Sequence, residues 1–143
     1  FRGVGGSRGN YDDGIGEQED VRAAVACLTD SGIEQIDLAG CSFGAWVNAL
    51  AVSGGLKVDN MIMVSPPAAF IDFTSIANLG NLKLIVTGSR DDIAPAGMVE
   101  KMYPTWNPAA KFEVIQVADH FYGGYEGKLE AALMDFIASK CSS

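Results

Sequence analysis

The sequence predicts a single α/β domain with a mostly parallel sheet and helices on both faces. Short apolar runs alternate along the chain with segments whose apolar residues recur every three or four positions, as in amphipathic helices. Two of the runs, Met61–Val64 and Leu82–Val86, are apolar at nearly every position, which is typical of parallel strands buried on both faces. Strands that alternate with helices form parallel sheets through right-handed crossovers, so helices are expected on both faces.

Glycine and proline mark the ends of the predicted helices. The first helix ends at Gly32 and the second at Gly54-Gly55, because glycine readily takes the backbone conformation that closes a helix. Pro95 suits the first position of the third helix, which is predicted to end near Pro104. In chain order we expect a helix from Glu17 to Gly32, a strand Ile36–Ala39, a helix Ala45–Val52, strands Met61–Val64 and Leu82–Val86, a helix with Met98, Val99 and Met102 on one face, a strand Phe112–Val117, and a helix with an apolar stripe from Leu129 to Ile137.

Composition and charge exclude several classes of protein. The chain has 143 residues, 48% hydrophobic, which is too apolar for a disordered chain, and it has no run of the roughly 20 apolar residues that a membrane-spanning helix needs. A net charge of −8 without a Lys/Arg cluster opposes nucleic-acid binding. The three cysteines cannot all pair and form no Cys-x-x-Cys, so we expect neither a disulfide scaffold nor a metal site, and a cytoplasmic location fits best.

The segment that precedes the first predicted helix is rich in glycine and then acidic. Asp12, Asp13, Glu17, Glu19 and Asp20 favour the dipole at the start of that helix and are predicted to form a solvated face. Arg2 is expected to position a neighbouring loop, with no catalytic role.

The segment Gly40–Gly44 matches the pattern G-x-S-x-G between a predicted strand and a predicted helix. In that context the serine sits on a tight turn and its hydroxyl projects from the carboxyl edge of the sheet. The backbone N–H of Phe43 then lies at a helix N-terminus, where it can donate to a developing oxyanion. We predict Ser42 as a nucleophile and Phe43 as an oxyanion-hole donor. The alternative is a glycine-rich turn that only binds an anion or packs tightly.

A serine hydroxyl needs a base, and the chain contains one histidine. His120 follows the last predicted strand, so it should lie on the same sheet edge as Ser42. The loop after Leu82–Val86 supplies two carboxylates for the imidazole, and we favour Asp91 because Asp92 is placed to cap the following helix or to pair with Arg90. The order Ser, Asp, His is that of α/β-hydrolases.

Aromatic residues near these loops are candidates for a substrate site. Phe70 and Phe73 follow the strand Met61–Val64, and Phe121 and Tyr122 follow His120. We predict that they line an apolar acyl or alcohol site, with packing in the core as the alternative for each of them.

Several phrases in a fixed order carry a resemblance to a known family. The sequence resembles the α/β-hydrolase superfamily, and more narrowly the small bacterial hydrolases of the dienelactone-hydrolase-like type. The phrases are Phe1-Arg2-Gly3-Val4-Gly5 with Ser7 and Gly9, Asp13-Gly14-Ile15-Gly16-Glu17, Leu38-Ala39-Gly40-Cys41-Ser42-Phe43-Gly44-Ala45, Ser65-Pro66-Pro67, Asp91 with Pro95, and Ala118-Asp119-His120-Phe121.

The resemblance implies that residues 1–143 are one domain, the C-terminal part of an α/β-hydrolase fold truncated at its N-terminus. Family members carry about 60 to 70 further N-terminal residues, which include the first strands and the second oxyanion donor. Without them Ile36–Ala39 would be an open hydrophobic edge, and we expect the chain alone to fold poorly. The oligomeric state is left open.

The function that the resemblance implies is esterase-like: a serine hydrolase with no metal or organic cofactor, acting on a small-molecule ester through Ser42, His120 and Asp91. A thioesterase or peptidase would use the same residues. A binding protein that keeps the fold without catalysis is the alternative from another class.

Overall fold

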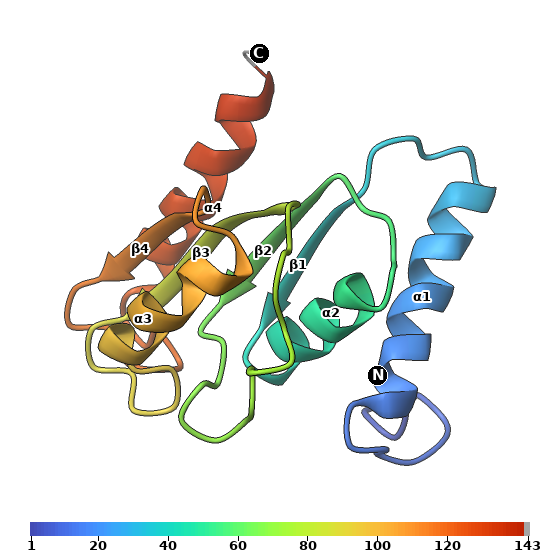
Figure 1. The fold of residues 1–143 in the computed structure, drawn as a ribbon, viewed down its shortest axis with the longest axis horizontal. Helices are drawn as coiled ribbons and strands as arrows, with labels where there is room; N and C mark the ends of the chain where they lie inside the picture. Colours follow the sequence, from blue (N-terminus) through green and yellow to red (C-terminus); the bar gives the residue numbers. More distant parts are fainter. Residues whose placement is uncertain (142–143) are drawn as a thin grey trace.

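A four-stranded parallel sheet is the centre of the structure. The computed structural model describes residues 1–141, with side chains up to Ser139. Within that range the strands pair in chain order, each parallel to the next (Figure 1). They are β1 (Asp37–Cys41), β2 (Asn60–Val64), β3 (Leu82–Gly88) and β4 (Lys111–Ile115). Because all four are parallel, their carboxyl ends meet at one edge, where the connecting loops gather.

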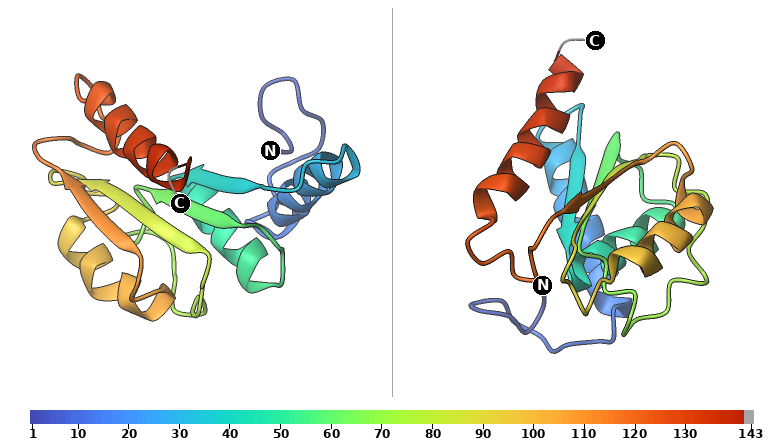
Figure 2. Two further views of the ribbon diagram at one scale, coloured as in Figure 1. Left: turned by 90° about the horizontal axis from the view of Figure 1, so that it is seen from above. Right: turned by 90° about the vertical axis from the view of Figure 1, so that its left-hand side faces the viewer.

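Helices cover both faces of this sheet, as the sequence predicts. The helices are α1 (Ile15–Asp30), α2 (Phe43–Ser53), α3 (Ala96–Trp106) and α4 (Glu126–Cys141). Figure 2 shows α2 and α3 on one face and α4 on the other. The face below α2 and α3 holds the larger apolar cluster, which includes Met63, Ile85 and Trp106, and the α4 face holds a smaller one around Val86. This two-sided burial explains why β2 and β3 are apolar at nearly every position.

The first helix lies outside this layered arrangement. Helix α1 packs against α2 through a small cluster that includes Val21, Val47 and Ala51. Strand β1 pairs with β2 along one side, and within residues 1–141 it is an edge strand of the sheet. None of the helices, over the residues that the structure describes, is long and apolar enough to span a membrane.

Several predicted boundaries differ by a few residues from the observed ones, and two of these differences have an identifiable local reason. The predicted strand Phe112–Val117 ends in fact at Ile115, and Val117 has a φ of 72° and is 42% exposed. Its N–H donates to Ser89 Oγ at 2.8 Å, which turns the chain away from the sheet. Helix α3 continues past Pro104 to Trp106. Pro104 has no N–H to donate within the helix, and the Trp106 side chain, 1% exposed, anchors this last turn in the core.

Candidate active site

The turn between β1 and α2 holds Ser42 in an unusual backbone conformation. Its φ of 52° and ψ of −123° lie outside the regions that residues with a side chain readily adopt. The Ser42 N–H donates to the Val64 carbonyl of β2 at 2.9 Å, and the Ser42 carbonyl accepts from Ala45 N–H at 2.9 Å. The turn is therefore fixed on one side by the sheet and on the other by the first turn of α2. Helix α2 begins directly at Phe43, two residues before the predicted start.

Gly40 makes this tight turn possible. A Cβ on Gly40 would lie 2.5 Å from the Gly44 carbonyl oxygen, which is far inside van der Waals contact with backbone. Gly40→Ala should therefore force β1 and α2 apart and lower the free energy of unfolding by about 1 to 3 kcal/mol, measured by urea denaturation of the whole protein. Gly97→Ala, in the first turn of α3 with open space around it, is the matched control and should leave stability unchanged or slightly higher. Equal stability of the two variants would contradict this role of Gly40.

His120 lies on the loop between β4 and α4, at the same sheet edge as Ser42. Its Nε2 is 2.8 Å from Ser42 Oγ, and its Nδ1 is 3.0 Å from each carboxylate oxygen of Asp91. The His120 side chain is 9% exposed and the Asp91 side chain is fully buried, whereas Ser42 is half-buried. The structure therefore brings together the three side chains that sequence reasoning singled out, with the hydroxyl toward solvent and the carboxylate behind the ring.

Besides facing His120, Asp91 accepts hydrogen bonds from the backbone of its own loop, a structural role that the sequence had suggested for Asp92. Its Oδ1 accepts the backbone N–H groups of Ile93 at 2.9 Å and Ala94 at 2.7 Å. The expected helix-capping role of Asp92 is wrong, because the residue at the N-cap of α3 is Pro95 and no side chain caps it. Asp92 is exposed. Asp91 therefore both accepts the backbone N–H groups of this loop and faces the imidazole of His120.

The loops that carry Asp91 and His120 are joined by their backbones. Ser89 N–H donates to the Ile115 carbonyl at 3.0 Å, and Arg90 N–H donates to the Ala118 carbonyl at 2.9 Å. A Cβ on Gly88 would overlap the Ala118 carbonyl, so glycine is what permits this approach. The carboxylate and the imidazole are thus carried by one rigid pair of loops.

Phe43 combines a backbone and a side-chain position beside Ser42. Its N–H is the first of helix α2, and the first N–H groups of a helix have no acceptor within that helix. Its ring packs against Tyr11, Phe1 and Trp46, with centroids 5.7, 5.8 and 5.7 Å away. The side chain is held by neighbours, and the N–H is placed to donate to an oxygen near Ser42.

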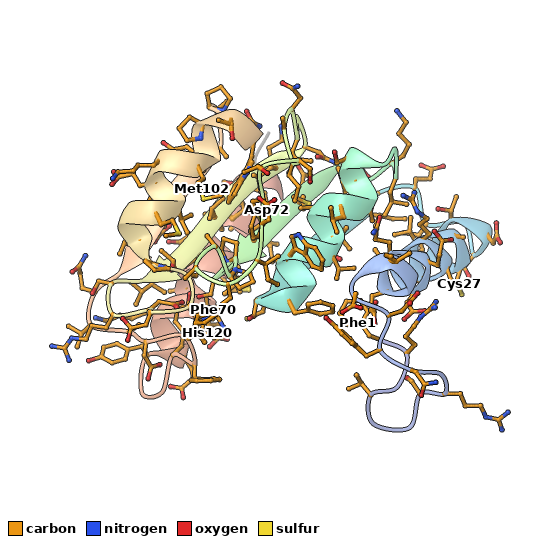
Figure 3. All side chains as sticks on the ribbon, turned by 60° about the horizontal axis from the view of Figure 1, so that its bottom comes forward. Phe1, Cys27, Phe70, Asp72, Met102 and His120 are labelled. Atoms are coloured by element: carbon orange, nitrogen blue, oxygen red, sulfur yellow. The ribbon has the colours of Figure 1, made fainter. Side chains whose placement is uncertain are left out.

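The four aromatic residues predicted to line a substrate site have different positions. Phe70 and Phe121 are 76% and 81% exposed, and the ring of Phe121 stands edge-on to His120 with centroids 5.5 Å apart. Figure 3 labels Phe70 and His120 at the same end of the molecule. Phe73, by contrast, is 1% exposed and packs on Trp106 in the core, which is the alternative given for it. Tyr122 is 3% exposed below the loop.

A shallow hollow of about 170 Å³ lies beside the imidazole. It is lined by His120 together with Arg90, Asp92, Ile93, Asp119 and Phe121. Two larger hollows lie beside α1, away from Ser42. Over residues 1–141, no three His, Cys, Asp or Glu side chains lie close enough to hold a metal ion between them.

Glu17 and Ser65 are two of the buried polar residues whose burial the sequence did not predict. Glu17, predicted to be solvated, is 1% exposed and accepts the N–H groups of Asp12 and Gly14, each at 2.9 Å. Burial raises the pKa of its carboxyl, but these bonds and the nearby Arg2 outweigh burial, so the net pKa is lowered. Glu17 lies three residues after Gly14, which is the spacing of a capping box. This spacing could have identified Glu17 in the sequence as a residue that binds the backbone at the start of the helix. The other residue is Ser65, buried at the end of β2.

Comparisons with known proteins agree with this geometry. No family model matches the chain. A solved structure of an "alpha-beta serine hydrolase homologue" from Coxiella burnetii is 34% identical, with a TM-score of 0.85 over 94% of this chain and 65% of that one. XC6422 from Xanthomonas campestris, described as a serine hydrolase without a lid, is 29% identical, with a TM-score of 0.87 over 97% of this chain and 63% of that one.

A curated protein is also similar to this chain in sequence. The uncharacterized protein RP471 of Rickettsia prowazekii (strain Madrid E) is 29% identical over 96% of this chain. The chain spans 62% of the length of RP471, and 65% and 63% of the two solved structures, so it corresponds to slightly less than two thirds of each. The chain has an α/β fold that matches solved α/β-hydrolase structures, and in sequence it is similar to the α/β serine hydrolase homologue from Coxiella burnetii.

Proposed function

We propose that the protein is a serine hydrolase that cleaves an ester-type bond of a small molecule through an acyl-enzyme. The observation that carries this proposal is the continuous path from Ser42 Oγ to His120 Nε2, at 2.8 Å, and from His120 Nδ1 to Asp91, at 3.0 Å. That path starts at a serine held in a strained turn and ends at a buried carboxylate. Ester hydrolysis needs this combination, because an unassisted hydroxyl is a poor nucleophile at neutral pH.

Each residue has a defined part in the proposed reaction. Ser42 Oγ attacks the carbonyl carbon while His120 Nε2 takes its proton, and Asp91 stabilises the imidazolium through Nδ1–H. The Phe43 N–H donates to the oxyanion. His120 then gives the proton to the leaving alcohol. A water molecule, deprotonated by His120, attacks the acyl carbon, the bond to Ser42 Oγ breaks, and His120 returns that proton to Ser42 Oγ as the acid leaves. The proposed steps need no metal or organic cofactor.

The surroundings of Ser42 favour a small substrate with an apolar group. Phe70 and Phe121 are exposed at this end of the molecule, and the hollow beside His120 holds about 170 Å³. The exposed ring of Phe121, whose centroid is 5.5 Å from that of His120, offers apolar surface that a substrate can cover. The narrower likeness to dienelactone-hydrolase-like enzymes is compatible with a small ester or lactone and is part of this proposal.

A fluorophosphonate probe is expected to label the whole protein at Ser42, since the probe reacts only with a serine activated by a base. The labelled residue can be identified by mass spectrometry of the digested protein. A panel of short esters, thioesters and lactones should then show the highest kcat/KM for esters with an apolar acyl or alcohol group. A folded sample that resists the probe and hydrolyses none of the panel would instead favour the alternative, a binding protein with the same fold.

A further inference from the structure

The loop that carries His120 has a second buried contact, on the side of the nucleophile. The Tyr122 hydroxyl lies 2.7 Å from Ser65 Oγ, and both side chains are buried, with residue exposures of 3% and 0%. Tyr122 comes two residues after His120, and Ser65 directly follows β2. The proposed reaction does not use either hydroxyl.

Ser65 is fixed at the centre of the site edge. Its N–H donates to the Val86 carbonyl of β3 at 2.8 Å, while the preceding residue, Val64, accepts the N–H of Ser42 at 2.9 Å. Its φ of 46° is a conformation that residues with a side chain rarely adopt. Ser65 thus sits between the nucleophile turn and the strand that leads to Asp91, in a position that the sheet determines.

The attachments of the His120 loop differ on its two sides. Toward the Asp91 loop it is held by backbone bonds to Ser89 Oγ and Arg90 N–H and by the bond from the His120 ring to the Asp91 carboxylate. Toward β1 and β2, the hydrogen bonds described for residues 1–141 are His120 to Ser42 and Tyr122 to Ser65. The bond between His120 and Ser42 must break and re-form during the proposed reaction. The bond between Tyr122 and Ser65 can persist, and it can therefore keep the distance between the His120 loop and the nucleophile turn constant.

Tyr122 is suited to a constant contact. Burial raises the pKa of its phenol to about 12, so the hydroxyl stays protonated over the pH range in which enzymes usually work. Its own φ is 56°, and Tyr125 N–H donates to its carbonyl at 2.7 Å, so the backbone on either side of the phenol is part of a turn. A buried phenol hydroxyl without a hydrogen-bond partner would lower the stability of the folded protein, so the hydrogen bond to Ser65 is expected to persist.

We propose that Tyr122 and Ser65 are positioning residues that hold the His120 loop at the distance from the nucleophile turn at which Nε2 reaches Ser42 Oγ. This inference rests on the proposed function. It assigns Tyr122, predicted from the sequence to contact the substrate, a place behind the imidazole. A small displacement of a reacting group lowers the rate of the chemical step more than it lowers binding.

Tyr122→Phe in the whole protein tests the inference, since it removes the hydroxyl and keeps the ring. We expect kcat for a short ester, and the rate of fluorophosphonate labelling, to fall about tenfold with KM changed less than twofold, in line with the loss of one buried hydrogen bond. Ser65→Ala should have the same effect, and the double variant should be no slower than either single one. Tyr125→Phe, in the same loop and packed on the same cluster, is the matched control and should keep the wild-type kcat.

The outcomes separate the inference from the proposed function. A wild-type protein that the probe does not label would remove the proposed function and the inference with it. A labelled wild type with Tyr122→Phe and Ser65→Ala both within twofold of its kcat, or with effects that simply add in the double variant, would overturn the inference alone. A lower melting temperature of both variants with an unchanged kcat well below that temperature would also overturn it, because the pair would then serve stability only.

Discussion

Turnover of a small ester by the Ser42→Ala variant is expected to be about 10⁴- to 10⁶-fold lower than that of the wild type. The variant lacks the Oγ that lies 2.8 Å from His120 Nε2, so no acyl-enzyme can form. Alanine carries the same Cβ as serine and is no more strained at a φ of 52°, and therefore the fold should be kept. Steady-state kinetics with the best ester of the panel, together with loss of probe labelling, measure the effect.

The control for this variant is Ser53→Ala, an exposed serine at the other end of the same helix, which should retain full activity. A second check uses non-additivity. When residues act as one catalytic unit, removing one of them abolishes the contribution of the others to kcat. Adding His120→Ala to Ser42→Ala should therefore lower kcat little further. Ser42→Ala with wild-type esterase activity would be incompatible with the proposed mechanism.

The order of helices and strands could be read from the sequence because burial imposes a period on it. Strands β2 and β3 are apolar at most positions because α2 and α3 cover one face of the sheet and α4 the other. The end of β4 could not be read in this way. Val117 continues the apolar run of the strand, and what ends the strand is a hydrogen bond to Ser89, 28 residues earlier in the chain.

The proximity of Ser42, Asp91 and His120 could be predicted from topology. Each follows a different parallel strand, and carboxyl ends of parallel strands share an edge. The sequence favours Asp91 over Asp92 because Asp92 is spaced to cap α3 or to pair with Arg90, and the structure shows that Asp92 does not make the cap. Which of two adjacent carboxylates faces the imidazole depends on the turn, and the turn is held by Asp91 itself.

The positions of the aromatic residues and of Glu17 depend on contacts that no local pattern contains. Phe70 and Phe73 are three residues apart in one loop, yet one is 76% and the other 1% exposed. Glu17 resembles its acidic neighbours in sequence but accepts two backbone N–H groups in the interior. Tertiary packing decides whether Phe70, Phe73 and Glu17 are buried. For this reason the residues that line a pocket are harder to predict from the sequence than the reacting groups.

Asp91→Asn is expected to lower kcat by about 10³- to 10⁴-fold while the fold is kept. Asparagine can retain the two backbone bonds, because its Oδ1 can still accept the N–H groups of Ile93 and Ala94. That orientation turns the Nδ2 amide toward His120 Nδ1, in the place of the carboxylate oxygen now 3.0 Å away. The amide donates, so Nδ1 must accept and the ring proton moves to Nε2.

The consequence is a histidine that cannot act as a base toward Ser42. With the proton on Nε2, the ring donates to Ser42 Oγ where it should accept, and the loss should fall on kcat while KM stays near the wild-type value. Kinetics with the preferred ester measure this, and Asp92→Asn, an exposed neighbour, is the matched control with an expected change of less than threefold. The reverse result, a severe loss in Asp92→Asn and a mild one in Asp91→Asn, would transfer the role to Asp92 and would require the loop after β3 to rearrange, since Asp91 occupies the buried side of it.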